Sequence, residues 1–483
     1  MTSTRQTARP LVPLLVIATA QLMLVLDDSI VNIALPTIQE ELAVRPVHLP
    51  WIVNAYILSF GALLLLGGRI GDLWGRKRTL QLGVLVFIAA SFAGGLGQST
   101  EMLIGARAVQ GIGAAMAAPN ALALIATTFD ERQLRDRALS LYGAMSGLGI
   151  VVGLLLGGVL TDTLGWRWVF FINIPIGLLV LLGSRTLVAG DRHTGRLGAL
   201  GATLGTAGMV SLVYAVTRFG EQGFADPAAY ALAAAAVALL FVFVLTQRGS
   251  RDPLVPLSLF RDRSRSGAYV TMLGLAIGPM GSFYVITLYM QQVRGYSPLL
   301  TGLSWLPFAV GIVIGAAIAP QLLLKVAPRL VAALGALLSA AGAFWFSFIT
   351  ADTGYWLHLA PAMLIVALGF GLGVIALTQA AVYRVDPDKA GIASALLNSA
   401  QQIGVALGLA ILAGVAAAVT AGPATTDLPA PEALTAGYSS ALLVGAGILL
   451  ATALLASLTL AERSSASRDG SSTTTTSAVS PSN

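Results

Sequence analysis

The sequence predicts an all-α integral membrane protein with fourteen transmembrane helices, and its composition is the first reason. Hydrophobic residues make up 56% of the 483 residues and charged residues only 10%, and the mean hydropathy is +0.82. A soluble domain carries roughly 25% charged residues, so this chain cannot cover a water-facing surface. Lipid offers no partner to backbone N–H and C=O groups, so apolar runs of about 20 residues must cross it as helices.

Fourteen such apolar runs follow one another along the chain. The segment Met1–Pro10 carries Arg5 and Arg9 and thus resembles the basic start of a secretory signal. The run after it is too long for a signal and ends without a small-residue cleavage pattern, so we expect a retained first helix. The expected helices begin near residues 11, 50, 80, 102, 138, 166, 197, 228, 267, 299, 329, 355, 391 and 436.

The distribution of basic residues predicts the orientation of these helices. With the N-terminus in the cytoplasm, 23 of the 28 Lys and Arg residues lie on the cytoplasmic side. This asymmetry follows the positive-inside rule, so we expect both termini to be cytoplasmic. The basic cluster Arg76–Arg78 then orients the chain, and no nucleic-acid partner is expected. Frequent Ala and a preference for Arg over Lys indicate a bacterial genome rich in GC, hence a multi-pass protein of the bacterial inner membrane.

The polar connections divide the chain into parts. The longest of them, RGSRDPLVPLSLFRDRSRSG, separates eight expected helices from six. The two helices before it carry few polar groups, which favours a peripheral pair over a substrate path. A Ser/Thr-rich tail is too polar to form a packed core, so we expect disorder there. The expected parts are a cytoplasmic leader (1–10), a six-helix bundle (11–188), a linker with two extra helices (189–247), a basic cytoplasmic loop (248–266), a second six-helix bundle (267–460) and the tail (461–483).

Formal charges well inside the expected helices are confined to Asp27, Asp28 and Arg107. Such a charge costs at least about 2.5 to 3.5 kcal/mol at the centre of a bilayer, and it usually marks an ion or proton pathway. At 1.5 Å per residue, Asp27 lies about 24 Å along its helix and Arg107 about 8 Å along an oppositely directed one. The opposite charges can therefore meet in the outer half of the membrane. An ion pair that only fastens two helices together is the alternative.

Helical periodicity gives its own prediction for the carboxylate that faces a cavity. Gln21, Asp28 and Asn32 recur at spacings of seven and four residues, which places them on one polar stripe. Asp27 lies about 100° away from that stripe. Periodicity therefore favours Asp28 as the cavity group.

The sequence LDDSIVNIALP (26–36) resembles the first-helix motif of the fourteen-span drug:proton antiporters of the major facilitator superfamily. The resemblance implies two six-helix bundles plus two extra helices, and it implies that Asp27 matters for transport. Family pattern and periodicity thus disagree. We place Asp27 first, because the motif extends through Asn32 and Pro36. Asp28 stands where the family usually has a small or hydroxylated residue, and it offers a second protonatable group.

The segment GGRIGDLWGRKRTL (67–80) resembles the superfamily's loop between helices 2 and 3, which implies a cytoplasmic gate. Glycine permits a tight turn and close helix approach, and an aspartate can bond to cations or to a helix N-terminus. Leu73 stands where a basic residue is common, which predicts a weaker latch. A charge-rich turn without a gating role is the alternative. The gate residues are Gly68, Asp72, Gly75, Arg76 and Lys77.

Two further helices resemble the same family. RAVQGIGAA (107–115) resembles the motif whose arginine, here Arg107, is linked to proton transfer. In GLGIVVGLLLGG (147–158), a four-residue repeat of small residues permits close helix packing. The family's antiporter signature has Pro after the middle glycine, where this chain has Leu154; a packing face with no bearing on transport direction is the alternative. The packing glycines are Gly149, Gly153 and Gly157.

Uncharged amides in the expected helices are candidates for the substrate cavity, although in lipid such groups also join helices. WRWVFFINIPIG (166–177), YMQQVRGYSPLLTG (289–302) and GIASALLNSAQQIGVALG (391–408) are further sequences that resemble the fourteen-span group. The candidate cavity residues are Gln21, Asn32, Gln110, Asn398, Gln401 and Gln402.

The absent motifs exclude other classes of function. The chain has no Cys, three scattered His residues, no phosphate-binding loop and no Gly-x-Ser-x-Gly elbow, so we expect no metal, no cofactor and no enzymatic activity. The sequence therefore predicts a monomeric secondary transporter that exports amphiphilic drugs or antibiotics by drug/proton antiport with alternating access. The alternatives are a proton-coupled carrier for one metabolite or natural product, and a membrane enzyme or sensor that does not transport.

Overall fold

The computed structural model describes residues 11–129, 131–188, 197–223, 225–250 and 252–460. Within these ranges every regular element is a helix, and fourteen helical segments are long and apolar enough to cross a membrane. The predicted fold class is confirmed, and each segment begins within six residues of its predicted start. The predicted leader (1–10) and tail (461–483) lie outside the described residues.

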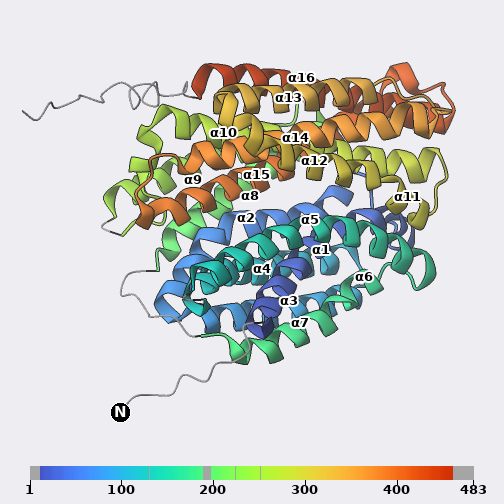
Figure 1. Cartoon of the computed structure of the whole chain (residues 1–483). Coiled ribbons are helices and arrows are strands. Elements are labelled where there is room, and N and C mark those ends of the chain that lie inside the picture. The colour runs from blue at the N-terminus through green and yellow to red at the C-terminus, as the bar shows by residue number, and fades with distance from the viewer. Residues whose placement is uncertain (1–10, 130, 189–196, 224, 251, 461–483) are drawn as a thin grey trace, which may run out of the picture.

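The first six spans form the lower half of the molecule in Figure 1. Span six is divided at Ile172 into two helices, and a short 3₁₀ turn follows it. The elements of this N-terminal half are α1 (Leu11–Glu41), α2 (Leu49–Trp74), α3 (Arg76–Gly95), α4 (Thr100–Thr128), α5 (Arg132–Thr163), α6 (Trp168–Phe171), α7 (Asn173–Gly183) and η1 (Ser184–Thr186).

The last six spans form the upper half (Figure 1). Two of them contain π-helical turns, η3 and η4, and a third is divided at Trp305. The elements of this C-terminal half are η2 (Leu257–Arg261), α10 (Arg263–Leu288), η3 (Tyr289–Val293), α11 (Pro298–Ser304), α12 (Leu306–Lys325), α13 (Pro328–Phe346), η4 (Tyr355–Leu359), α14 (Ala360–Val382), α15 (Pro387–Thr420), η5 (Pro423–Thr425) and α16 (Ala430–Thr459).

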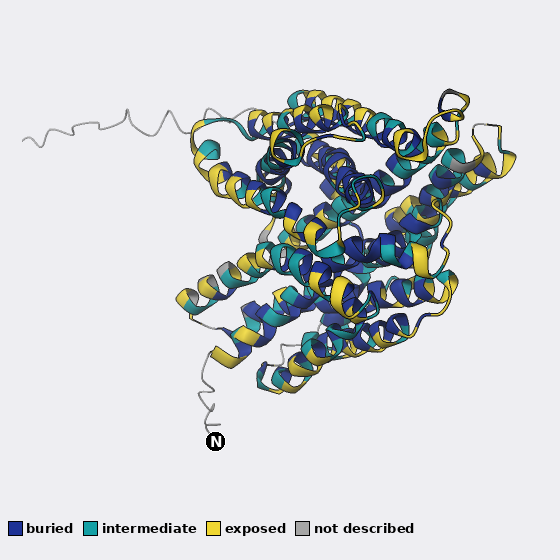
Figure 2. Ribbon diagram, turned by 90° about the vertical axis from the view of Figure 1, so that its right-hand side faces the viewer, coloured by how far each residue is buried: buried dark blue, intermediate teal, exposed yellow. Residues whose placement is uncertain are grey.

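The two extra spans, α8 (Ala199–Gln222) and α9 (Pro227–Gly249), lie at one side of the two halves (Figure 1). α8 packs against α2 of one half and α15 of the other, and α9 packs against α8. Only 11% of the most apolar stretch of α9 is buried inside the protein, as expected of a helix that faces lipid on most sides. Figure 2 shows the same distribution for the whole molecule, with buried segments inside and exposed segments around them.

Several helices begin where the sequence supplies a side chain to cap the free backbone N–H groups of the first turn. Ser99 accepts a hydrogen bond from the Met102 amide at 3.2 Å, Asp262 from Arg265 at 2.8 Å, and Ser297 from Leu300 at 3.2 Å. Such caps contribute about 1 kcal/mol each. α10 therefore begins at Arg263, so the last four residues of the loop expected from the sequence (263–266) belong to the helix.

The two halves are in contact along α5 only toward one end of the molecule. We call the end with Glu41 the Glu41 end, and the end with the α2–α3 turn at Gly75 the basic end. A Cβ built on Gly158 of α5 would lie 2.8 Å from the Leu299 Cα of α11. Gly147 lies three turns nearer the basic end on the same helical face, and a Cβ there would meet nothing within 4 Å.

The two halves are also in contact along α2, and here too the contact is lost toward the basic end. Near the middle of α2, a Cβ built on Gly61 would lie 2.6 Å from the Gln402 Cβ of α15. Seven residues nearer the basic end, a Cβ on Gly68 would meet only Pro119 of its own half within 4 Å. Along both helices the halves are therefore packed at the Glu41 end and part toward the basic end.

Candidate functional site

Asp27 and Arg107 form a salt bridge in the interior of the N-terminal half. Arg107 Nη1 lies 2.6 Å from Asp27 Oδ2, and both side chains are completely buried. Gln110 Nε2 and Asn173 Nδ2 donate to the other carboxylate oxygen at 2.6 Å and 2.7 Å. The carboxylate thus receives donors from α4 and from α7, which compensate for its removal from water.

Arg107 has partners besides the carboxylate. Its Nε donates to the Ile52 carbonyl at 3.0 Å, its Nη1 donates to Gln110 Oε1 at 2.7 Å, and its guanidinium lies 4.3 Å from the centre of the Tyr56 ring. A cation held against a ring face is stabilised by the ring quadrupole. The guanidinium therefore keeps compensating contacts even when Asp27 carries no charge.

Asp28, favoured by helical periodicity, is placed differently. It is only partly buried, and its backbone carbonyl accepts a bond from Asn32 Nδ2 at 2.8 Å. Asn32 itself is 8% exposed, and Gln21 is half-buried. The polar stripe thus leaves Asp28 more accessible than Asp27, whereas Arg107 is paired with Asp27.

Two polar partners in this cluster, Asn173 and Ser91, were not among the residues predicted for the site. Both side chains are fully buried, and Ser91 Oγ accepts a bond from Gln110 Nε2 at 2.8 Å. Each is an isolated polar residue in an otherwise apolar span, which is the one signal that the sequence offers. Gln110 was assigned to the substrate cavity, but it is 1% exposed and bonded to Asp27.

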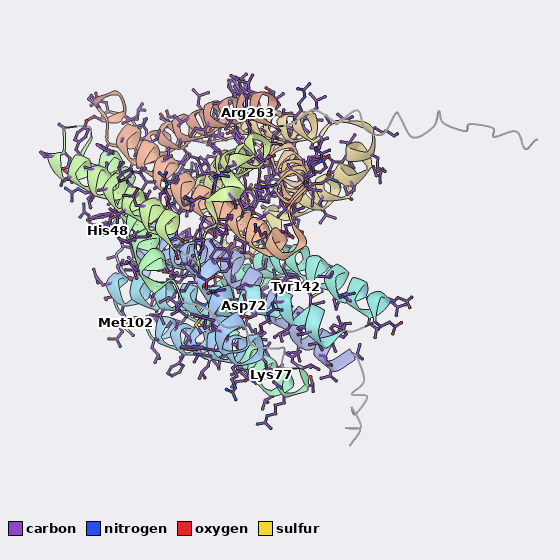
Figure 3. The ribbon with its side chains drawn as sticks, turned by 90° about the vertical axis from the view of Figure 1, so that its left-hand side faces the viewer. His48, Asp72, Lys77, Met102, Tyr142 and Arg263 are labelled. Atoms are coloured by element: carbon purple, nitrogen blue, oxygen red, sulfur yellow. The ribbon has the colours of Figure 1, made fainter. Side chains whose placement is uncertain are left out.

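Two of the predicted gate residues, Asp72 and Lys77, are labelled in Figure 3; they lie on either side of the α2–α3 turn at the basic end. Gly75 has φ of 105°, a conformation that favours glycine. Arg76 donates to Asp72 over 3.2 Å, and Lys77 Nζ donates to the Arg185 and Leu187 carbonyls at 2.9 Å. These bonds join elements of the same half.

Among the described residues, an ion pair joins this region to the loop that precedes the C-terminal half, between Arg69 of α2 and Asp252. Gly68, also predicted for the gate, lies in ordinary contact with Pro119. A cation one turn before Asp72 on α2 therefore carries this cross-link, whereas Asp72 bonds to Arg76 within the α2–α3 turn.

The three predicted packing glycines of α5 lie against α1. Cβ atoms built on Gly149, Gly153 and Gly157 would lie within 3.0 Å of Val25, Ser29 and Ile30 respectively. Real Cβ atoms are almost never so close, so these positions let the two backbones approach. The site helix α1 is thereby held along one side by α5.

The predicted amides of α15 lie where the two halves part. Gln401 and Gln402 are half-buried, Gln402 rests against Gly61, and Asn398, one turn nearer the basic end, is exposed. Ser399 between them donates to the Gly61 carbonyl at 2.8 Å. These residues therefore line the point at which the interface opens.

Comparison with known proteins bears on the whole chain. The family model described as Major Facilitator Superfamily matches residues 17–409. The chain belongs to the Major Facilitator Superfamily. It is therefore a member of a family of membrane transporters, as the sequence analysis predicted, and not an enzyme.

Named relatives of this major facilitator protein resemble it over nearly its whole length. The puromycin resistance protein pur8 of Streptomyces alboniger is 41% identical over 96% of this chain and 94% of its own. The cephamycin export protein CmcT of Amycolatopsis lactamdurans is 36% identical over 94% of this chain and 93% of its own. The lincomycin resistance protein of Streptomyces lincolnensis is 35% identical over 84% of each chain.

Solved structures share the fold at low sequence identity. The POT family transporter PepTSo superposes with a TM-score of 0.67 at 14% identity, covering 93% of this chain and 99% of that one. A D-xylose-proton symporter gives a TM-score of 0.64 at 14% identity over 94% and 99% of the two chains. The likeness confirms the two-bundle major facilitator architecture.

Proposed function

We propose that this protein exports small amphiphilic molecules, cationic or lipophilic antibiotics among them, across the bacterial inner membrane in exchange for protons. The observation that carries the proposal is the fully buried Asp27–Arg107 pair, set in a two-bundle fold that is open at one end. Ionisable groups at membrane depth typically serve proton or ion pathways. The names of the relatives, which denote antibiotic resistance or export, support the direction of transport and the class of substrate.

The charge distribution supports placing the basic end and both termini in the cytoplasm. The structure then corresponds to a state that is closed to the outside and open to the cytoplasm, since the halves part toward the basic end. In this state an amphiphilic molecule reaches Asn398 and Gln401 from the cytoplasm or the inner leaflet. We assign these amides, with Gln21 and Asp28 on α1, to the wall of the substrate path.

Proton exchange takes place at Asp27 in this scheme. In the outward-open state Asp27 takes a proton from outside and the substrate leaves; in the inward-open state the proton is released as substrate binds. Arg107 remains held by the Ile52 carbonyl, Gln110 and Tyr56 in both protonation states. When Asp27 is protonated, the buried Arg107 guanidinium therefore still has polar and aromatic partners. This keeps the protonation of Asp27 reversible.

The available energy is sufficient without ATP. A proton-motive force of about 200 mV supplies roughly 4.6 kcal/mol for each proton that enters. Since 1.4 kcal/mol corresponds to a factor of ten, one proton per substrate supports a gradient of about a thousandfold. The protein works as a monomer, because each chain holds both bundles and its own proton site.

A carrier for a single natural product is a second candidate, favoured by the names of relatives that each denote one antibiotic. Everted membrane vesicles with an imposed pH gradient separate the two. A panel of fluorescent cations, puromycin-like nucleosides and β-lactams is supplied outside, and accumulation is followed. Broad export predicts proton-dependent accumulation of several classes; one class alone supports the single-product carrier, and none contradicts both.

A further inference from the structure

Asn54 of α2 is a buried amide without a partner. Its side chain is completely buried, and neither its Oδ1 nor its Nδ2 has a hydrogen-bond partner among the described residues. Buried polar groups are nearly always bonded, so an unsatisfied amide in the protein interior calls for a physical explanation. The proposed proton and substrate steps make no use of it.

Helical geometry places Asn54 at the interface between the two halves. Pro50 and Gly61 lie four residues before and seven residues after it, and therefore on the same face of α2. Pro50 lines a small space together with Ala410 of α15, and Gly61 rests against Gln402 of the same helix. Asn54 lies between these two contacts, so it faces α15 across the seam.

The opposing part of α15 explains why the amide is unsatisfied. α2 and α15 pack in opposite directions, since Pro50 meets residue 410 and Gly61 meets residue 402. The segment between those contacts reads IGVALGL (403–409) and contains no side chain that donates or accepts a hydrogen bond. Its backbone groups are engaged in the helix. When the seam is closed, the Asn54 amide therefore loses its hydrogen bonds to water and gains none from α15.

We propose that Asn54 is a positioning residue of the transport cycle, which destabilises the state closed at the Glu41 end and so keeps the outward-open state populated. When the halves separate at the Glu41 end, the amide regains water or meets the substrate, and the penalty disappears. This inference rests on the alternating access in the proposed function, but not on which ion drives it. The residue acts on the equilibrium between two openings, and not on the chemistry at Asp27.

The chain contains no cysteine, so a pair of spin labels can be added to the full-length protein directly. Leu164 follows α5 in the N-terminal half and Trp356 lies in η4 of the C-terminal half, and both are exposed at the Glu41 end. The variant with Leu164→Cys and Trp356→Cys is spin-labelled and reconstituted in liposomes. Pulsed electron–electron double resonance then measures the distance between the two labels. Opening at this end lengthens the distance between the labels.

The test compares Asn54→Val and Asn54→Ala with wild type in this background. Val replaces the amide by two methyl groups and is somewhat larger than Asn, and Ala removes the amide without any risk of overpacking. Ser59→Ala is the matched control, because it also removes a polar atom from α2 but faces α4 of its own half, where its Cβ lies 2.8 Å from a Cβ built on Gly111. Membrane content and thermal stability of each variant are measured in parallel.

We expect the ratio of short to long distances to rise at least about fivefold in one or both Asn54 variants, the factor that corresponds to relief of one unsatisfied buried amide. Ser59→Ala leaves the ratio at the wild-type value. If wild type shows both distances but neither Asn54 variant shifts the population toward the short one, the inference is overturned. An equal shift in Ser59→Ala would also overturn it. Either result would leave the proposed function untouched. A single population in wild type at every pH tested would contradict the inference and the alternating access on which it rests.

Discussion

At the scale of single residues, Asp27 and Asp28 differ in what surrounds each carboxylate. Asp27 accepts bonds from Arg107, Gln110 and Asn173, whereas Asp28 is only partly buried. A carboxylate held by a cation and two amides can change its charge without a change in its position. In the proposed function, Asp27 is therefore the group that couples proton uptake to the arrangement of α1, α4 and α7.

The first prediction concerns the two aspartates. Asp27→Asn lowers gradient-driven accumulation from as much as about a thousandfold to unity, because the proton no longer contributes its free energy. Asp28→Asn lowers it less, since Asp28 is not paired with Arg107. Accumulation of a fluorescent substrate in everted vesicles, normalised to the amount of protein, measures both; an inactive Asp28→Asn with a fully active Asp27→Asn contradicts the assignment.

The second prediction concerns Asn173, which holds Asp27 from α7. Asn173→Ala removes a bond to a charged group, worth about 1.5 to 3 kcal/mol, and slows proton-driven exchange about tenfold or more. Asn120→Ala is the control, because Asn120 is also a buried amide of this half but bonds to the Gly67 and Met116 carbonyls. If both variants slow exchange equally at equal membrane content, Asn173 serves packing alone.

The competing predictions for Asp27 and Asp28 show the limit of sequence reasoning at this scale. Periodicity identified a polar stripe through Asp28 and Asn32, but Asn32 bonds to the backbone of α1 itself. The partners of Asp27 come from two other helices, α4 and α7, and no periodicity within α1 carries that information. The family pattern indicated Asp27 as the group that matters for transport, although Asn173 and Ser91 were missed because each is a single polar residue in an apolar span.

At the scale of helices, the fourteen spans follow from hydropathy and length, so their number and starting points were predicted closely. The breaks at Ile172 and Trp305 and the π-helical turns η3 and η4 were not predicted, because they do not change hydropathy. The repeat of glycines in α5 indicated close packing, but only the structure identifies α1 as the helix packed against it.

The third prediction compares two glycines of α5. Gly153→Val forces a side chain to within 3 Å of Ser29 on α1 and destabilises the protein by about 1 to 3 kcal/mol, the usual cost of overpacking. Gly147→Ala is the matched control, because a Cβ there meets nothing within 4 Å. Thermal unfolding in detergent measures the difference; equal melting temperatures would show that α1 and α5 need no close approach.

The fourth prediction concerns the closed seam at the Glu41 end. Gln291 Nε2 of η3 donates to the Ile33 carbonyl of α1 at 3.0 Å, across the two halves. Gln291→Leu removes this bond and raises the rate at which an aqueous maleimide labels Leu154→Cys, a buried position of α5 at the same seam, several-fold. Gln81→Leu, which loses a bond to Ser184 within one half, is the control; equal labelling in the two variants contradicts the latch.

At the scale of the whole molecule, the halves are packed at the Glu41 end and part toward the basic end, while the buried ion pair lies within one half. The order of spans and the two-bundle architecture follow from composition and family motifs. Which end is open, and that α8 packs against both halves, depends on long-range contacts that no local pattern specifies. The proposed alternation between two openings would therefore leave the Asp27–Arg107 pair intact, because both residues belong to the same half.

Uphill transport by the purified protein in liposomes, with a pH gradient as the sole energy source, decides whether an acid in α1 carries the proton. Wild type accumulates substrate against its gradient, and the accumulation collapses when a protonophore is added. A double variant, Asp27→Asn with Asp28→Asn, equilibrates substrate at most and accumulates none. Accumulation by the double variant at the wild-type level would contradict proton coupling at this site, because the acids that then remain in α1, Glu40 and Glu41, lie at the end of the helix and not beside Arg107.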